Sequence, residues 1–209
     1  MLMPPIAKIL FGAAWRRASF RGVMNQQQNT CPRVAIRPAG DADMDAVTAI
    51  YAHHVRHGRA SFETEPPTAV DMRRRREDVM SKGLPWFVAD GGGEVLGYAY
   101  AGPYRPRAAY ANTVENSVYL RPDAMGWGIG RSLLAALIAA REQAGLRQMV
   151  AVVGDYANHA SIRLHEALDF RHAGVLRDVG YKHGAWLDSV LLQRRLGDGS
   201  DTPPARIDA

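Results

Sequence analysis

Hydrophobic and polar positions follow two different periods in the first part of the chain. Segment 33–39 (RVAIRPA) is typical of a strand. In the segment after it, residues recur every three or four positions, as on one face of a helix: Met44, Val47, Ile50, Tyr51 and His54. A helix therefore follows the first strand, and Asp41 or Asp43 is its expected N-cap.

The next segments continue this alternation of periods. Residues 66–83 predict a second helix, because Thr68 and Asp71 stand in a capping-box arrangement and Gly83 supplies an end. Segments 84–90 and 94–104 flank a GGG turn and predict a hairpin, and 111–120 predicts another strand.

The last third of the chain predicts two helices and three strands. Segment 131–145 has an apolar face and ends at Gly145, 146–154 is a continuous apolar strand, and 158–168 is a short helix before a final strand pair over 170–196. The order β-α-α-β-β-β-α-β-α-β-β predicts the α/β class, with one mixed sheet covered by helices.

Composition indicates one domain with two tails. A chain of 209 residues with 47% hydrophobic content can bury one sizeable core, which we expect over residues 32–196. Residues 1–31 form a basic leader, with Met24 as an alternative start of the protein, and we expect the leader and the turn-rich tail 197–209 to be disordered. Cys31 is the single cysteine, and no apolar run is long enough to span a membrane, so we expect a cytoplasmic protein without a membrane partner.

The net charge of +5 gives little support to a nucleic-acid partner. Residues 1–40 contain six Lys and Arg and no Asp or Glu, so the remainder is close to neutral. The run Arg73–Arg76 could form a phosphate-binding patch, but four consecutive helical positions point in four directions. We interpret this run as a solvated helix face, and we expect no nucleic-acid binding.

A glycine-rich turn, MGWGIG, lies between a predicted strand and a predicted helix at residues 125–130. A Rossmann fingerprint would need its third glycine at Arg131, and a P-loop would need a Gly-Lys pair that is absent. What remains is a turn whose N–H groups open into a helix N-terminus, which suits a pyrophosphate with Arg131 as an added cation. A tight turn without a ligand is the alternative.

Two polar features flank this turn. Alternation in the strand 113–120 places Glu115 and Ser117 on one face, and Asn158 and His165 lie seven residues apart on one line of the short helix. Each feature taken alone is compatible with a structural role. His53 and His57 are spaced for a metal, but no third ligand follows, so we expect no metal site.

Several segments in order resemble one superfamily. SFETEP, GYAYAGPYRPRAAY, TVENSVYL, VAVVG, SIRLHEAL and YKHGAWLD are similar to segments of the GNAT superfamily of acyl-CoA-dependent N-acetyltransferases, and among these of the phosphinothricin and methionine sulfoximine acetyltransferases. The resemblance covers about residues 33–196. It implies the GNAT fold, with a mixed, largely antiparallel central sheet, and acetyl-CoA as co-substrate without a metal.

The resemblance also implies roles for particular residues. Glu115 would be the base that deprotonates the amine, directly or through water, and His165 would be the acid for the leaving thiolate. An N–H group near Ser117 would polarise the thioester carbonyl. The expected coenzyme-binding residues are Val118, Tyr119, Leu120, Gly126, Trp127, Gly128, Ile129, Gly130, Arg131 and Asn158.

The site for the acetyl acceptor, the amine that receives the acetyl group, is expected to recognise an amino acid. Arg105 and Arg107 lie beside the Glu115 strand and are suited to capture a carboxylate or phosphinate, although surface ion pairs are an alternative. Phe62 would supply an apolar wall. We therefore expect direct acetylation of an α-amino group of the phosphinothricin or methionine sulfoximine type, which would confer antibiotic or herbicide resistance.

The sequence is also compatible with other functions. The protein could acetylate a protein N-terminus or another amine, or be a non-catalytic acyl-CoA-binding module. Two positions depart from the family pattern, Met125 where the loop usually has Gln or Arg, and Asp169 where the helix usually ends in glycine. The family resemblance also implies a homodimer.

Overall fold

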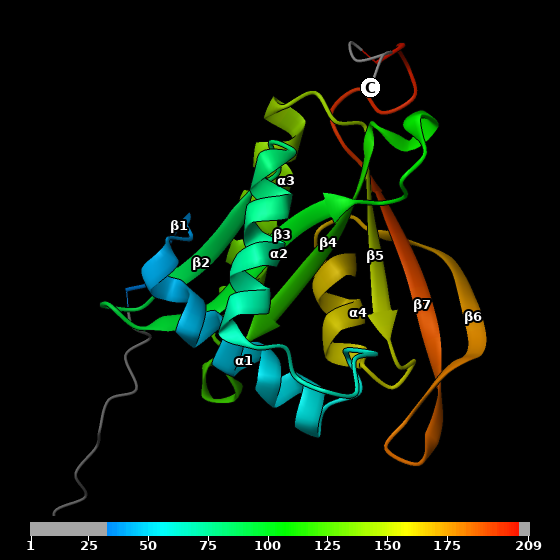
Figure 1. Ribbon diagram of the computed structural model, residues 1–209. Helices are drawn as coiled ribbons and strands as arrows, with labels where there is room; N and C mark the ends of the chain where they lie inside the picture. Colours follow the sequence, from blue (N-terminus) through cyan, green and yellow to red (C-terminus); the bar gives the residue numbers. More distant parts are fainter. Residues whose placement is uncertain (1–32, 205–209) are drawn as a thin grey trace, which may run out of the picture. The chain divides into compact units, whose positions relative to one another are not determined.

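Seven strands in the described part of the chain, residues 33–204 of a computed structural model, pair into one sheet (Figure 1). The order in the sheet is β1-β2-β3-β4-β5-β7-β6, and every neighbouring pair is antiparallel except β4 and β5. The predicted element order and the mixed, largely antiparallel sheet are confirmed. The strands are β1 Ala35–Pro38, β2 Trp86–Asp90, β3 Val95–Pro103, β4 Thr113–Leu120, β5 Gln148–Gly154, β6 Arg171–Lys182 and β7 Ala185–Arg195.

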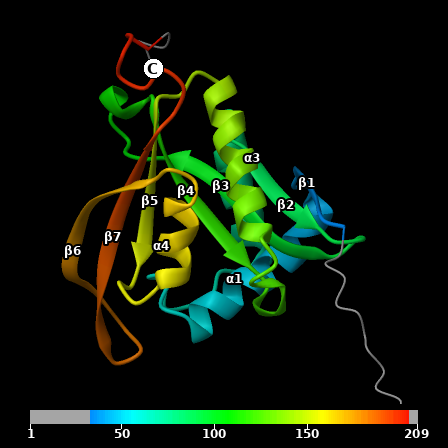
Figure 2. The ribbon, with the colours of Figure 1, turned by 180° about the vertical axis from the view of Figure 1, so that it is seen from behind.

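Four helices cover the two faces of the sheet. α1 (Met44–His57) and α2 (Ala69–Ser81) lie on one face (Figure 1), and α3 (Ile129–Gln143) and α4 (His159–Glu166) lie on the other, in front of the sheet in Figure 2. Each face has its own apolar core. Residues of α3 and α4 pack on β3, β4, β5 and β7, whereas those of α1 and α2 pack on β2 and β3.

Helix ends follow the local chemistry of the sequence. Thr68 is the N-cap of α2: its Oγ1 accepts the N–H of Asp71 and the Asp71 carboxylate accepts the N–H of Thr68, as the capping box predicts. The start of α1 differs in detail. Residues 41–43 form a 3-10 turn, α1 begins at Met44, and the Asp43 carboxylate caps the turn by accepting the Gly40 N–H at 2.7 Å.

The four consecutive arginines of α2 each contact a different carboxylate. Arg73 and Arg75 pair with Asp45 and Glu63 at 2.6 Å, Arg74 lies 3.5 Å from Asp71, and Arg76 pairs with Asp41 at 2.6 Å. Their side chains diverge, as helical geometry requires. This arrangement neutralises the run rather than gathering it into one phosphate-binding patch.

The ends of the chain are only partly described. The predicted basic leader 1–31, with Met24 and Cys31, lies outside the described residues, as do 205–209 of the tail. Residues 197–204 belong to the predicted disordered tail. Here the Gly199 N–H donates to the Leu196 carbonyl, Arg147 donates to the Pro203 carbonyl, and Arg195 pairs with Asp201. Among residues 33–204, no helix is long and apolar enough to cross a membrane.

Candidate active site

The parallel pairing between β4 and β5 stops halfway along the two strands. Residues Thr113 to Asn116 pair with Gln148 to Ala151, and beyond this point β4 continues to Leu120 and β5 to Gly154 without pairing to each other. β4 keeps its antiparallel partner β3 over its whole remaining length. The edge of β4 that faces β5 beyond Asn116 therefore offers backbone groups to a ligand.

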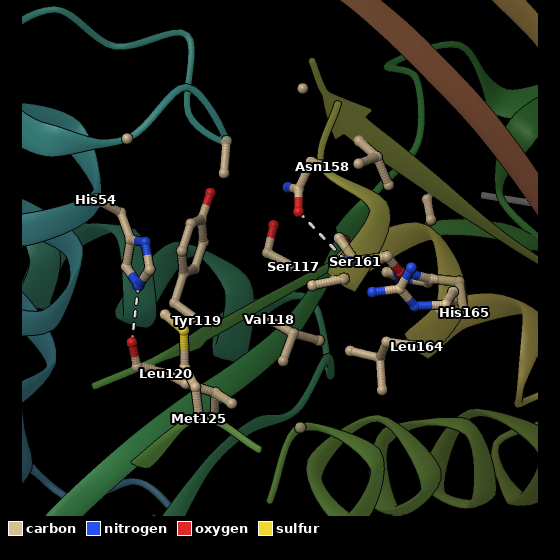
Figure 3. Close-up of a pocket in the computed structure, with 18 of the residues that line it drawn as sticks. His54, Ser117, Val118, Tyr119, Leu120, Met125, Asn158, Ser161, Leu164 and His165 are labelled. Atoms are coloured by element: carbon tan, nitrogen blue, oxygen red, sulfur yellow. Dashed lines mark hydrogen bonds between the residues drawn. The ribbon is translucent and has the colours of Figure 1, made fainter. Parts of the chain in front are cut away.

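A groove of about 780 Å³ occupies this opening. Its walls come from the diverging ends of β4 and β5, the turn before α3, the start of α4 and the segment after α1. Figure 3 shows Val118 and Tyr119 on one side and Asn158, Ser161 and His165 on the other. Of the predicted coenzyme-binding residues, the groove is lined by Val118, Tyr119, Leu120, Gly126, Gly128, Ile129, Gly130, Arg131 and Asn158, whereas Trp127 is exposed and is not among its lining residues.

The glycine turn delivers backbone N–H groups to this groove. Gly126 and Gly128 have φ of 82° and 78°, in the left-handed region that favours glycine, and Gly128 is the N-cap of α3. No side chain caps this helix, so its first N–H groups face the groove without a side-chain acceptor. Together with the partial positive charge of the helix N-terminus, they form a site suited to phosphate.

The charges that line the groove are mostly positive. Arg59, Arg131 and Arg163 line it, and its one acidic lining residue, Asp155, lies 3.6 Å from Arg59. Sequence reasoning predicted only Arg131 of these three cations. Such a groove suits a ligand with several negative charges.

Asn158 begins α4 as its N-cap. Its Oδ1 accepts the N–H of Ser161 at 3.3 Å, and in Figure 3 its amide nitrogen points away from this hydrogen bond. The side chain is thus fixed by the helix while it lines the groove. An amide held in this way can donate to a ligand.

His165 is buried under the same wall, on α4. Its Nδ1 donates to the Ser161 carbonyl at 2.8 Å, and its Nε2 lies 2.9 Å from Oδ1 of Asn116, whose amide nitrogen donates to Val150. Both ring nitrogens therefore face oxygen acceptors, which favours the doubly protonated ring. Burial has the opposite effect and lowers the pKa of His165. The protonated form of the ring would have an acceptor at each nitrogen, and burial makes that form a stronger acid than an exposed histidine.

His54 is a groove residue that sequence reasoning assigned only to a helix face. Its Nε2 donates to the Leu120 carbonyl at 2.7 Å (Figure 3), and burial lowers its pKa. The Leu120 carbonyl therefore already has a hydrogen-bond donor within the protein. The pattern of apolar residues in α1 could not reveal it, because the partner lies 66 positions away in the sequence.

Glu115 lies on the other face of β4 from Asn116, because side chains alternate along a strand. Its carboxylate makes no hydrogen bond or ion pair within residues 33–204, and it is not a lining residue of the groove. Burial raises the pKa of Glu115, and the positive charge of Arg105 opposes that shift. A carboxylate with a raised pKa beside the strand opening is suited to accept a proton.

The predicted acceptor-binding residues do not line the groove. Arg105 and Arg107 line a second cavity, of about 880 Å³, at the loop after β3. Phe62 packs against the backbone of β5 and β6, since a Cβ atom at Gly154 or Gly180 would lie 3.1 or 2.0 Å from its ring. Only Arg105 is linked to Glu115, through its charge.

The described residues contain no group of three or more His, Cys, Asp or Glu side chains placed to hold a metal ion. His53 and His57 are exposed, and their rings lie 4.9 Å apart. A third ligand is absent from their surroundings within residues 33–204.

Known proteins with similar sequences and folds are acetyltransferases. The family model of the acetyltransferase (GNAT) domain matches residues 36–191. The chain is 54% identical over 169 residues to phosphinothricin N-acetyltransferase from Alcaligenes faecalis, covering 81% of this chain and 86% of that protein. It is 39% identical to L-methionine sulfoximine/L-methionine sulfone acetyltransferase from Pseudomonas aeruginosa, covering 81% and 98%.

A solved structure shows the same architecture. The crystal structure of a GNAT superfamily phosphinothricin acetyltransferase from Sinorhizobium meliloti in complex with AcCoA superposes with a TM-score of 0.80 at 42% identity, covering 83% of this chain and 94% of that one. The matched family model spans most of the chain, including both walls of the groove. The chain therefore belongs to the GNAT family of acetyltransferases.

Proposed function

We propose that this protein transfers the acetyl group of acetyl-CoA to the α-amino group of a small amino acid of the phosphinothricin or methionine sulfoximine type. The observation that carries the proposal is the end of the β4–β5 pairing at Asn116 and Ala151. It opens the sheet between a groove suited to phosphate on one side and the Glu115 carboxylate on the other. The names of the relatives at 54% and 39% identity support the acceptor class.

The groove residues fit acetyl-CoA. The pyrophosphate would lie on the N–H groups from Gly126 to Arg131, with the guanidinium groups of the groove adding charge. The pantetheine arm would pair with the free edge of β4 near Val118, and the Asn158 amide would donate to it. Acetyl-CoA supplies an activated thioester, whose carbonyl carbon is attacked by the amine.

Glu115 prepares the nucleophile in this scheme. An alkyl ammonium with a pKa of about 10 is mostly protonated at neutral pH and cannot attack. Glu115 takes the proton, directly or through a water molecule, and the neutral nitrogen then forms a bond to the carbonyl carbon. A backbone N–H near Ser117 stabilises the negative charge that develops on the carbonyl oxygen.

His165 completes the transfer. As the C–S bond breaks, the electron pair stays on sulfur, and a thiol pKa of about 8.5 means that a proton donor assists departure. In its protonated form His165 would carry the donated proton on Nε2, and its lowered pKa makes that form a stronger acid. The proton reaches the thiolate once the contact with Asn116 is exchanged.

The acceptor would be held by Phe62 and two arginines. Arg105 influences Glu115 electrostatically, which supports a place for the acceptor's carboxylate or phosphinate beside the base. Arg107 lines the same cavity as Arg105 and would add a second cation. The homodimer, the cytoplasmic location and the role in antibiotic or herbicide resistance remain predictions that the family resemblance implies or the composition favours.

A panel assay tests this function. Acetyl-CoA consumption and free thiol release are measured with phosphinothricin, methionine sulfoximine, methionine sulfone, ordinary amino acids and a short peptide. We expect kcat/KM to be highest for the first three. Preference for the peptide would identify a protein N-terminal acetyltransferase, and acetyl-CoA binding without thiol release for any amine would identify a non-catalytic module. The Glu115→Gln variant is the matched control for enzyme-dependent turnover.

A further inference from the structure

Lys182 is a buried lysine with no assigned role. It is the last residue of β6, beside the turn to β7, and only 3% of its surface is exposed. Its Nζ donates to the carbonyl oxygen of Ser61 at 2.7 Å, across 121 positions of sequence. Burying an ammonium group costs free energy, so an apolar side chain such as methionine would fill this place at a lower cost. The presence of a buried amine at this position is therefore explained by its hydrogen bond to Ser61.

The bound segment, Ser61 to Glu63, is held from two further directions. The hydroxyls of Tyr51 on α1 and Ser61 lie 2.9 Å apart, and Tyr51 also donates to Glu63. Arg75 on α2 makes two hydrogen bonds to the Glu63 carboxylate, at 2.6 and 3.2 Å. These contacts join the segment to α1 and α2, and the hydrogen bond from Lys182 joins it to the far end of the sheet.

Phe62 sits between these two anchors. Its ring lies on the backbone of Gly180, two residues before Lys182 on the same face of β6, where a Cβ atom would come within 2.0 Å. The ring also meets Gly154, the last residue of β5, in the part of that strand that pairs with β7 but not with β4. Phe62 therefore lies at the end of the opening between β4 and β5, where its ring packs against the backbone of Gly154 and Gly180.

The same segment continues into the groove. Gly58, Arg59 and Ala60 line it, and a Cβ atom at Gly154 would lie 2.8 and 3.0 Å from the carbonyl oxygens of Arg59 and Ala60. In Figure 3 the loop that follows α1 passes above the ring of Tyr119. One stretch, 58–63, thus forms a groove wall at its start and carries Phe62 at its end.

We propose that Lys182 is a positioning residue for acceptor binding: its hydrogen bond to the Ser61 carbonyl fixes the 58–63 segment, so that Phe62 stands at the end of the β4–β5 opening. The inference rests on the proposed function for its kinetic consequence. It does not depend on that function for the placement of the segment.

Two measurements on the full chain test this inference, with Lys182→Met, Lys182→Arg and Lys82→Met compared. Lys82 is the matched control for the exchange measurement only, because it is an exposed lysine whose Nζ binds Asp78 at 2.6 Å but it lines the cavity of Arg105 and Arg107. The first measurement is hydrogen exchange of amides in residues 58–66. We expect faster exchange there in Lys182→Met, with exchange in α3 unchanged, wild-type behaviour in Lys82→Met, and partial recovery in Lys182→Arg.

The second measurement separates KM from kcat. Without this hydrogen bond the acceptor must order the segment as it binds, and an ordering cost comparable to one such bond corresponds to about tenfold in affinity. We therefore expect Lys182→Met to raise KM for the amino-acid acceptor by about that factor, while KM for acetyl-CoA changes by less than about twofold. Equal rises in both KM values, together with faster exchange throughout the protein, would show a general stability role and overturn the inference. Unchanged exchange in 58–66 would overturn it as well. If the wild type acetylates no amine, the proposed function fails, and the exchange data alone decide whether Lys182 holds the segment.

Discussion

Nε2 of His165 and Oδ1 of Asn116 lie 2.9 Å apart in the buried wall of the groove, at the last residue of β4 that pairs with β5. The contact connects the proposed acid on α4 to the point where the sheet opens. Asn116 is itself fixed by its hydrogen bond to the Val150 carbonyl at 3.1 Å. The protonation of His165 is therefore controlled from the sheet as well as from its own helix.

Replacing Asn116 with leucine removes the acceptor for the Nε2 proton. The protonated ring loses one hydrogen bond, so the pKa of His165, already lowered by burial, falls further. If His165 acts as the acid, the basic limb of the kcat–pH profile of Asn116→Leu moves to lower pH.

Replacing His165 itself tests the same assignment, and the His165→Ala variant should lose roughly 10²-fold in kcat. A basic limb that stays in place in Asn116→Leu would exclude His165 from this role.

Glu115→Gln removes the proposed base. We expect a loss of roughly 10²-fold in kcat at pH 7 and partial recovery at high pH, where more of the amine is already neutral. In the wild type the carboxylate must be ionised, so activity falls as the pH drops through a pKa that burial has raised above 4.5. A variant whose pH profile equals that of the wild type would contradict the assignment.

Arg105 opposes the rise in the pKa of Glu115 because its positive charge favours the carboxylate. In Arg105→Met, the acidic limb of the kcat–pH profile should therefore move to higher pH, with a higher KM for the acceptor. Arg107→Met is the matched comparison, since both arginines line the second cavity but Arg107 is not among the charges that shift Glu115. Equal shifts of the acidic limb in both variants would argue against a direct effect of Arg105.

Gly128→Ala tests the turn before α3. With φ of 78°, an alanine there is strained by on the order of 1 kcal/mol, and relaxation of the turn would move N–H groups away from the phosphate site. We expect a higher KM for acetyl-CoA and a lower melting temperature. Gly130→Ala is the control, because its Cβ would meet Leu164 at 3.4 Å, an ordinary contact in a helix. Similar KM values for the two variants would show that backbone conformation at Gly128 is unimportant for binding.

Met125→Arg tests the atypical first position of the loop. Met125 lines the groove and is 49% exposed, so a guanidinium there can reach an anionic ligand without burial. We expect KM for acetyl-CoA to fall by about threefold at low salt, an advantage that shrinks as ionic strength rises. Met125→Leu should behave like the wild type, and an arginine effect that is independent of salt would point to another cause.

Asp169→Gly tests the second departure from the family pattern. Asp169 has φ of 63°, a conformation that costs most residues on the order of 1 kcal/mol and glycine almost nothing. Its ion pair with Arg194 is exposed and adds little. We expect the variant to unfold at a higher denaturant concentration with unchanged kcat/KM. A lower midpoint would show that the Arg194 contact outweighs the backbone strain.

The sequence by itself determined the elements and their order. The two hydrophobic periods predicted seven strands and four helices in the order found, because burial of one face imposes a period of 2 or 3.6 on the residues. The turns were equally local, since Gly83, Gly126, Gly128 and Gly145 all have positive φ and Thr68 caps its helix. The groove residues near these turns could be predicted for the same reason, aided by the family resemblance.

Only the tertiary structure decided how distant segments combine. The end of pairing at Asn116 and Ala151, the insertion of β7 between β5 and β6, and the hydrogen bond from Lys182 to Ser61 join residues far apart in the chain. The placement of Arg105 in a second cavity, away from the groove, also follows from the packing of the sheet. Periodicity reports which face of an element is buried, but not which other element covers it, and the chemistry of this site depends on those neighbours.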